Sequence, residues 1–271
     1  PMLNDPGPTV ISGINGPQPH RFGVSYDFLA GFIGPSSIHL PHIGRFTAQE
    51  YDGAIRFTEP LDGDWVLTSS VQGGARIWDG LPQRLALYRA GLDWRLYTPQ
   101  VGQWSAQFDF NPTINSDLAT SLHREAFNFD GSATAFYHVS PQFMFVLGVQ
   151  YWDRVDKIVL PNAGIVWNPD DRTELRLLFP KSRIGYFLGN WGDASHWLYG
   201  SAEYHVESYQ VNLQAFPGVQ QVQMSDWRFA LGLRSDHPTY DKFVEVGYVI
   251  SRHVKALSPA PDVNIGDGIM V

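Results

Sequence analysis

Apolar and polar side chains alternate with a period of two along most of the chain, in segments that end at Pro, Gly, Asn or Asp. In the segment 104–112 one face carries Trp104, Ala106, Phe108, Phe110 and Pro112. The other face carries Ser105, Gln107, Asp109 and Asn111. Because successive side chains of a strand point to opposite faces of a sheet, this alternation predicts strands with one apolar and one polar face. Helical periodicity is almost absent, so we expect an all-β fold.

Twelve segments follow this pattern. They are 20–31, 44–58, 64–77, 85–98, 102–112, 124–138, 142–153, 157–168, 173–187, 197–211, 223–235 and 242–254. An even number of strands brings both chain ends to one side of a barrel, as in bacterial outer-membrane proteins. Most odd-numbered connections are longer than the even-numbered ones, as expected for long outer loops and short periplasmic turns. Two connections break this rule, because 154–156 is short where a loop is expected and 212–222 is long where a turn is expected.

Strand length and aromatic placement distinguish a membrane barrel from a soluble one. The segments match the ~9–11 residues that a tilted strand needs to cross a bilayer, whereas typical strands are nearer ~5–6 residues. Aromatic residues make up 14% of the chain, and many lie near segment ends, where membrane interfaces are expected. These are Trp65, Trp78, Tyr97, Trp104, Tyr137, Tyr151, Trp167, Tyr186, Trp197 and Trp227. The alternative is a soluble lectin-like or lipocalin-like β domain.

Composition excludes several other classes. The net charge of −8 disfavours nucleic acid as a partner, since phosphate binding needs a basic face. The chain has no cysteine, so it can form neither a disulfide framework nor a thiolate metal site. No stretch approaches the ~20 apolar residues of a transmembrane helix. Since the sequence starts at Pro1, we expect that a secretory signal peptide has been cleaved.

We therefore predict one closed antiparallel transmembrane barrel of about 12 strands, comprising residues 20–254. Its strand ladder and lipid-facing belt, rather than a large internal apolar core, would stabilise it. Residues 1–19 are rich in Pro and Gly and are expected to form an irregular arm that serves as a leader, a lumen plug or a strap to a partner. Residues 255–271 are expected to form a C-terminal tail, either a periplasmic extension or a contact with a partner.

The polar faces supply candidate lumen residues that would set ion selectivity or, with both signs interleaved, brace a narrow lumen. They are Arg89, Asp93, Arg95, Asp109, Arg124, Asp130, Arg176, Glu203, His205, Glu207, Arg228 and Arg234. Glu203, His205 and Glu207 share one face of one strand, where they could hold a divalent metal. We expect instead that they pair with lumen arginines on neighbouring strands, so no metal and no other cofactor is predicted.

The segment 173–187 contains a change of phase. Leu175, Leu177 and Phe179 share one parity, whereas Ile184 and Tyr186 have the other. A β-bulge near Pro180 would produce this shift, because proline cannot donate to a ladder.

A membrane-embedded hydrolase would need a serine near a histidine and an orienting Asn or Asp. Ser201 with His205, or Ser140 with His138, would supply the first two groups. Neither pair lies in a motif, so no catalytic residue is predicted and the protein is not expected to be an enzyme.

From residue 87 onward, six short stretches in a characteristic order carry a family resemblance. They are Leu87–Trp94, Phe143–Arg154, Leu160–Pro169, Glu174–Gly185, Trp227–Leu233 and Glu245–Arg252. In these stretches the chain resembles a family of outer-membrane β-barrels, classified as a domain of unknown function, that is common in planctomycetes. The resemblance implies a barrel and a bacterial outer-membrane location but no activity. The chain departs from many outer-membrane proteins in carrying a tail after its last predicted strand, in place of a terminal aromatic residue.

Two functions remain open from the sequence. The first is a narrow passive pore for small solutes or ions. The second is a structural or assembly barrel with an occluded lumen that anchors envelope or surface partners through its arm, loops and tail. Outer-membrane lipid is the expected partner in both cases, together with protein partners or further copies of the chain in the second. Small lumen residues such as Gly91 and Gly148 favour open space, whereas the interleaved charges favour occlusion.

Overall fold

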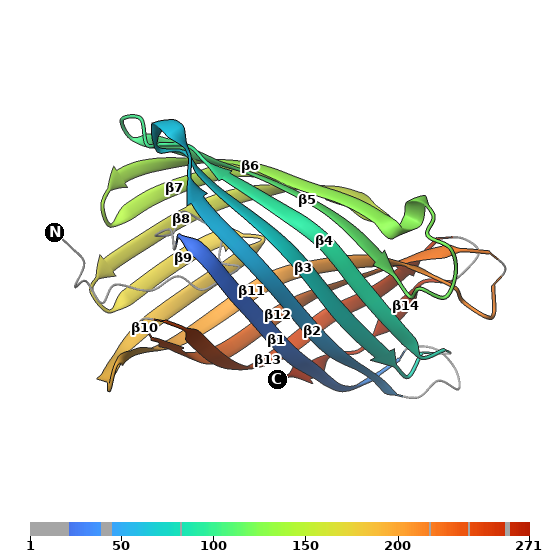
Figure 1. Cartoon of the computed structure of the whole chain (residues 1–271). Helices are drawn as coiled ribbons and strands as arrows, with labels where there is room; N and C mark the ends of the chain where they lie inside the picture. Colours follow the sequence, from blue (N-terminus) through green and yellow to red (C-terminus); the bar gives the residue numbers. More distant parts are fainter. Residues whose placement is uncertain (1–21, 39–44, 82, 217, 238, 258–260) are drawn as a thin grey trace.

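The computed structural model describes residues 22–38, 45–81, 83–216, 218–237, 239–257 and 261–271 as a barrel of tilted strands (Figure 1). The strands are β1 (Gly23–Ser37), β2 (Arg45–Pro60), β3 (Val66–Asp79), β4 (Leu85–Tyr97), β5 (Trp104–Ser116), β6 (Phe127–Ser140), β7 (Phe143–Asp153), β8 (Lys157–Asp170), β9 (Thr173–Phe179), β10 (Lys181–Trp191), β11 (Ala194–Val211), β12 (Gln220–Asp236), β13 (Asp241–Ala256), β14 (Val263–Ile265) and β15 (Gly268–Met270). Two 3₁₀ turns, η1 (Asp62–Asp64) and η2 (Arg124–Ala126), complete the described elements. No helix among the described residues is long and apolar enough to span a membrane. The predicted arm 1–19 lies outside the described residues.

The ring closes through β15. Strands β1 to β13 pair antiparallel with their neighbours in chain order, and β15 lies between β13 and β1 through the pairs Gly247↔Met270 and Ile33↔Met270. The ring therefore contains fourteen strands, and β14 pairs with β13 beside it. The prediction of a closed antiparallel barrel is confirmed, but the expected count of about 12 strands is wrong.

Two segments account for the difference in strand count. The segment 173–187 contains not one bulged strand but a tight hairpin, in which β9 ends at Phe179, β10 begins at Lys181 and Arg176 pairs with Arg183. The change of parity thus marks a reversal of chain direction. The predicted tail 255–271 contributes β14 and β15, whose short apolar stretches complete the ladders of β13 and β1.

The extra hairpin also resolves one of the two exceptions among the connections. With β9 and β10 counted separately, the connection 212–219 falls at the same end as the longer connections 117–126 and 257–262. We call this the loop end. The opposite end carries short turns such as 141–142, 171–172 and 192–193, and we call it the turn end. The connection 154–156 stays short at the loop end.

The outer face of the ring is apolar. Tyr26 and Phe28 of β1 are each 76% exposed, and comparable side chains follow on the other strands. They include Ile55, Phe57, Val71, Leu92, Trp94, Phe108, Phe110, Phe145, Leu147, Val149, Val159, Leu177, Ile184, Phe229, Leu231, Val244 and Val246. Along the middle of the described strands, no outward position holds Asp, Glu, Lys or Arg. A continuous exposed apolar surface of this extent is typical of a face that contacts lipid.

The interior contains a feature that the sequence analysis did not anticipate. The parts of β11 and β12 nearest the loop end, residues 206–211 and 220–224, are buried on both faces. Gln210 of β11 even pairs in parallel with Ser116 of β5, six strands away around the ring. We call residues 204–216 and 218–226 the inner hairpin, because this part of the chain is buried and reaches from β11 and β12 to β5, six strands away.

An apolar cluster surrounds the inner hairpin. It is formed by Ile33, Ile38, Phe46, Ala48, Trp78, Leu85, Leu87, Tyr209, Val211, Val222, Met224, Val249, Val254, Val263 and Ile265. Trp78 of β3 stands at its centre, edge-on to Phe46 of β2 and to Tyr209 of the hairpin. The expectation that the barrel lacks a large internal apolar core is therefore wrong at the loop end, because the inner hairpin supplies apolar side chains that a water-filled lumen would lack.

Candidate functional site: the lumen

Most of the predicted lumen residues lie on strands and face inward. Arg89, Asp93 and Arg95 alternate with the exposed Tyr88, Leu92 and Trp94 of β4, and Asp109 of β5 and Asp130 of β6 follow the same parity. Arg176 lies on β9, Glu203, His205 and Glu207 lie on β11, and Arg228 and Arg234 lie on β12. Arg124 is the exception, because it belongs to η2 at the loop end and its side chain is 60% exposed.

The expected charge ladder forms only in part. Arg95 Nε donates to Asp109 Oδ1 across β4 and β5 at 2.6 Å, as the sequence suggests. Other partners differ from the simple pattern. Asp130 binds Arg154 at 2.6 Å, Arg124 binds Asp153 at 2.7 Å, Arg89 donates to Gln72 at 2.8 Å and Asn111 donates to Asp93 at 3.3 Å. Arg176 pairs with Glu174 on its own strand, and Arg234 lies 2.9 Å from Asp236.

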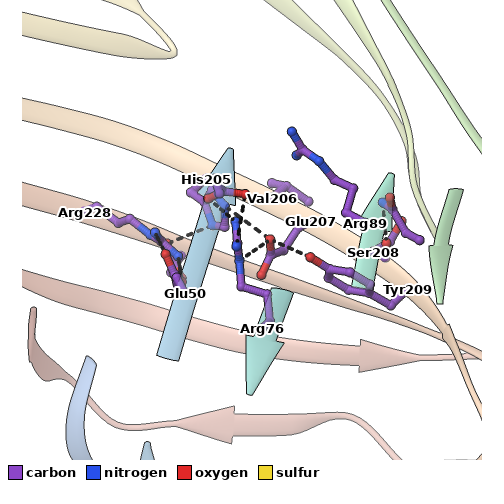
Figure 2. Close-up of polar contacts among 12 residues, drawn as sticks. Glu50, Arg76, Arg89, His205, Val206, Glu207, Ser208, Tyr209 and Arg228 are labelled. Atoms are coloured by element: carbon purple, nitrogen blue, oxygen red, sulfur yellow. Dashed lines mark hydrogen bonds and ion pairs between the residues drawn. The ribbon is translucent and has the colours of Figure 1, made fainter. Parts of the chain in front are cut away.

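The strongest polar contacts join the inner hairpin to the wall formed by β2 and β3 (Figure 2). Arg76 of β3 donates from Nε to Glu207 Oε2 at 3.2 Å and from Nη2 to Asp52 Oδ2 at 2.9 Å. Tyr209 also donates its hydroxyl to Glu207 Oε2 at 3.2 Å. Since Arg76 and Glu207 are each about 95% buried, this pair is screened little by water.

A second buried pair lies beside the first. Arg228 of β12 donates to both oxygens of Glu50 of β2 at 2.8 Å, and its Nε donates to Asp226 Oδ1 at 2.9 Å. His205 Nδ1 lies 3.5 Å from the same oxygen of Asp226. The two-point geometry fixes both position and orientation, as is typical of arginine with carboxylates. The two pairs therefore hold the base of the inner hairpin to β2 and β3 across the lumen (Figure 2).

The part of the inner hairpin nearest its tip is held by β5, by β6 and by the connection between them. Ser208 donates to Asn128 of β6 at 2.9 Å, and Asn115 of β5 donates to the carbonyl of Ser208 at 2.9 Å. Gln210 donates to the carbonyl of Ser121 at 2.9 Å, and the backbone of His123 donates to Gln210 Oε1 at 2.7 Å. With contacts to β2, β3, β5 and β6, the hairpin extends from β11 and β12 to one continuous arc of the wall, β2 to β6.

Glu203, His205 and Glu207 do not converge on one point. Glu203 pairs with Lys181 of β10 at 2.7 Å, and Glu207 pairs with Arg76. Glu207 thus pairs with an arginine, but Arg76 lies on β3, which is not adjacent to β11, and Glu203 pairs with a lysine of the adjacent β10. Across the described ranges, no group of three His, Asp or Glu side chains is placed to hold a metal ion.

The two serine–histidine pairs considered above do not form in this structure as hydrogen bonds between those partners. His138 Nε2 instead lies 3.0 Å from Ser105 Oγ of β5, and His205 lies beside Asp226 and Glu207.

A cavity of about 900 Å³ opens below the inner hairpin, toward the turn end. Its inward-facing lining comes from β1, β2 and β10 to β13. These residues are Leu29, Gly31, Ile33, Glu50, Lys181, Arg183, Tyr199, Ser201, Glu203, Arg228, Ala230, Phe243 and Glu245, with Met270 of β15. Tyr199 donates its hydroxyl to Glu245 at 2.6 Å, and the guanidinium of Arg183 lies 3.7 Å above the Tyr199 ring.

Arg183 differs from the other charged residues of this cavity. It is 93% buried, yet its Nε and Nη2 atoms have no hydrogen-bond partner. Lys181 and Arg228 are occupied by Glu203 and Glu50. A buried guanidinium with N–H groups that make no hydrogen bond costs free energy, and such a group is a candidate for binding an anion.

Sequence reasoning missed Glu50, Asp52 and Arg76, although their positions carried a signal. Glu50 and Asp52 flank the outward Tyr51, and Arg76 has the parity opposite to that of the outward Val71, so each has the parity of an inward residue. Arg183 lies beyond the change of phase at Pro180, where the β9–β10 hairpin turns it into the lumen.

Comparison with known proteins adds little to this description. No family model matches the chain, and no curated protein matches it either. Among solved structures, a triple mutant of the Rh. blastica porin matches with 7% sequence identity, covering 91% of this chain and 99% of the porin chain, at a TM-score of 0.26. The barrel architecture therefore rests on the strand pairing itself.

Proposed function

We propose that the protein is an outer-membrane barrel whose lumen is closed by its own inner hairpin, so that in this state it binds and anchors rather than conducts solutes. The burial of residues 206–211 and 220–224 on both faces carries this proposal. A diffusion pore needs a continuous water path, whereas here side chains and backbone pack across the lumen at the loop end. The apolar outer face supports the membrane location.

The family resemblance found in the sequence is consistent with this location, and membership of that planctomycete family stays a prediction. By analogy with other outer-membrane barrels, the longer connections of the loop end would face the cell exterior. The closed end would then present its loops to envelope or surface partners.

Single-channel recording in planar bilayers tests the closure. We expect no conductance steps from the wild-type protein. A variant in which residues 207–224 are replaced by Asn-Gly, a two-residue hairpin turn, should produce steps because the obstruction is gone. Steps in the wild type would contradict permanent closure.

A cysteine tether provides a second variant that keeps the hairpin in place. Ser116 and Gln210 are ladder partners, and the chain has no cysteine of its own, so Ser116→Cys with Gln210→Cys forms a single defined disulfide. If the double-cysteine variant shows conductance steps that disappear on oxidation and return on reduction, the inner hairpin acts as a gate. Steps that persist after oxidation would show that solutes pass beside the hairpin and would refute the proposal.

A further inference from the structure

Between β1 and β13 the barrel wall contains a stretch without a continuous ladder. At the level of Ile33 and Gly247, β15 fills the space between β1 and β13. Nearer the turn end, residues 28–31 of β1 pair with β2 and residues 242–246 of β13 pair with β12. Within the described residues, no strand lies between these two edges. Strands next to each other in a sheet are ~4.8 Å apart, so the missing strand leaves a gap about twice that width.

The cavity borders this gap. Leu29 and Gly31 face the lumen, whereas Ala30 and Phe32 face outward, and all four line the same cavity. On the other edge, the outward Val244 lines it together with the inward Glu245. Outward as well as inward residues of both edges therefore contribute to the lining of the cavity beside the gap.

The two ends of the cavity have different chemistry. The outer mouth is apolar, with Phe32, Val244 and Val271 at its margin. The inner end holds Arg183, whose Nε and Nη2 atoms have no hydrogen-bond partner although the side chain is 93% buried. An apolar margin on the membrane side and a buried cation with unsatisfied N–H groups inside match a ligand that has an acyl chain and an anionic head.

We propose that this cavity binds an acyl-chain amphiphile with a carboxylate or phosphate head, which enters from the membrane between β1 and β13. The head accepts hydrogen bonds from Arg183, and the chain lies along the gap and the apolar mouth. The volume of about 900 Å³ lies within the ~300–1,000 Å³ of small-molecule sites. This assignment rests on the membrane location proposed above.

Photo-crosslinking of the full chain in phosphatidylcholine nanodiscs tests the site. The probes are a diazirine-labelled palmitate and its uncharged glyceryl ester, and the cross-linked peptides are mapped by mass spectrometry. We expect palmitate to mark residues of β1, β10 and β13 that line the cavity. Competition by unlabelled palmitate or by lysophosphatidate then shows whether a carboxylate or a phosphate head is preferred.

Two substitutions separate the head site from the chain path. Arg183→Met should weaken palmitate labelling about tenfold, as expected for losing a charge-assisted pair of hydrogen bonds, and should leave the glyceryl ester unaffected. Gly31→Trp should reduce the labelling by both probes, because a Cβ there meets only Val271 O at 3.7 Å and Glu50 Cβ at 3.9 Å and the ring fills the gap. Arg95→Met is the matched control, since Arg95 faces the lumen outside this cavity.

Several outcomes would overturn the site. They are equal palmitate labelling of wild type and Arg183→Met, labelling spread around the whole outer surface, and labelling confined to peptides from residues 1–21. Each variant is first checked for wild-type unfolding in urea. Wild-type protein that inserts into nanodiscs but is not labelled refutes the amphiphile site alone, whereas failure to insert refutes the membrane location.

Discussion

The two halves of β11 and β12 belong to the same strands but occupy different surroundings. In the half near the turn end, Leu198, Leu231 and Leu233 face outward, and Tyr199 and Arg234 face the lumen. In the inner hairpin, Gln221 and Gln223 of β12 lie on one face, and Gln220 lies on the other face with Val222 and Met224. In β11, Ser208 and Gln210 lie on the face opposite Tyr209. A strand that touches lipid needs one wholly apolar face. Polar residues on both faces therefore mark the part of β11 and β12 that does not face lipid, although residues 222–225 of β12 stay paired with β13.

Loss of the buried ion pair between Arg76 and Glu207 should lower the free energy of unfolding the most. Arg76→Met leaves Glu207 buried without its cation, which is expected to lower the free energy of unfolding by about 3–5 kcal/mol. Urea unfolding followed by tryptophan fluorescence in phospholipid bilayers measures it. The double variant with Glu207→Gln should recover much of the loss. No recovery would mean that Arg76 stabilises the barrel through Asp52 alone.

A charged residue on the outward face of β12, in its half near the turn end, should lower the free energy of unfolding somewhat less. Leu231→Arg places a guanidinium on the outward face of β12, and mid-bilayer arginine costs about 2–4 kcal/mol in transmembrane barrels. The same unfolding assay gives the value, and Leu231→Ala controls for lost apolar area. If Leu231→Arg and Leu231→Ala are equally stable in bilayers, the outer face does not contact lipid there.

Loss of a neutral hydrogen bond between the inner hairpin and β6 should lower the free energy of unfolding by less again. Ser208→Ala removes the donor to Asn128 while both side chains stay fully buried, so we expect a loss of about 1–3 kcal/mol. The matched double variant with Asn128→Leu would remove the unsatisfied amide. Ser208→Ala with wild-type stability would indicate that water replaces the hydroxyl, and hence that the inner hairpin is less tightly packed than its burial implies.

The smallest effect is expected outside the hairpin. Lys255 and Asp156 form an ion pair at 2.6 Å with side chains 37% and 51% exposed. Exposed pairs contribute about 0–1 kcal/mol, so Lys255→Met should change the unfolding free energy little. A loss as large as that of Arg76→Met would overturn the distinction between buried and exposed pairs on which the ranking rests.

Sequence predicted the wall of the barrel well because the wall is governed by local alternation. The faces of β4 and β5 follow directly from Leu92, Trp94, Phe108 and Phe110. The hairpin at Pro180 was misread because a bulge and a reversal produce the same change of parity. β14 and β15 were missed because each has only three residues, too few for a periodic pattern.

The interior was less predictable for a different reason. Glu50 and Arg228 are 178 residues apart and lie on β2 and β12, which are four strands apart around the ring. Which inward residues meet there depends on the strand count and on the path of the inner hairpin, and neither follows from alternation. The inward direction of Arg228 was predicted, but its partner could not be.

The inner hairpin also constrains the order of assembly. It is continuous with β11 and β12, so it does not have to be threaded into a finished barrel. The ring is sealed by β15 against β1, after the hairpin in chain order. The wall can therefore curl around the inner hairpin while the sheet is still open, and β15 can pair with β1 afterwards. The inner hairpin can thus take its place before the seam exists.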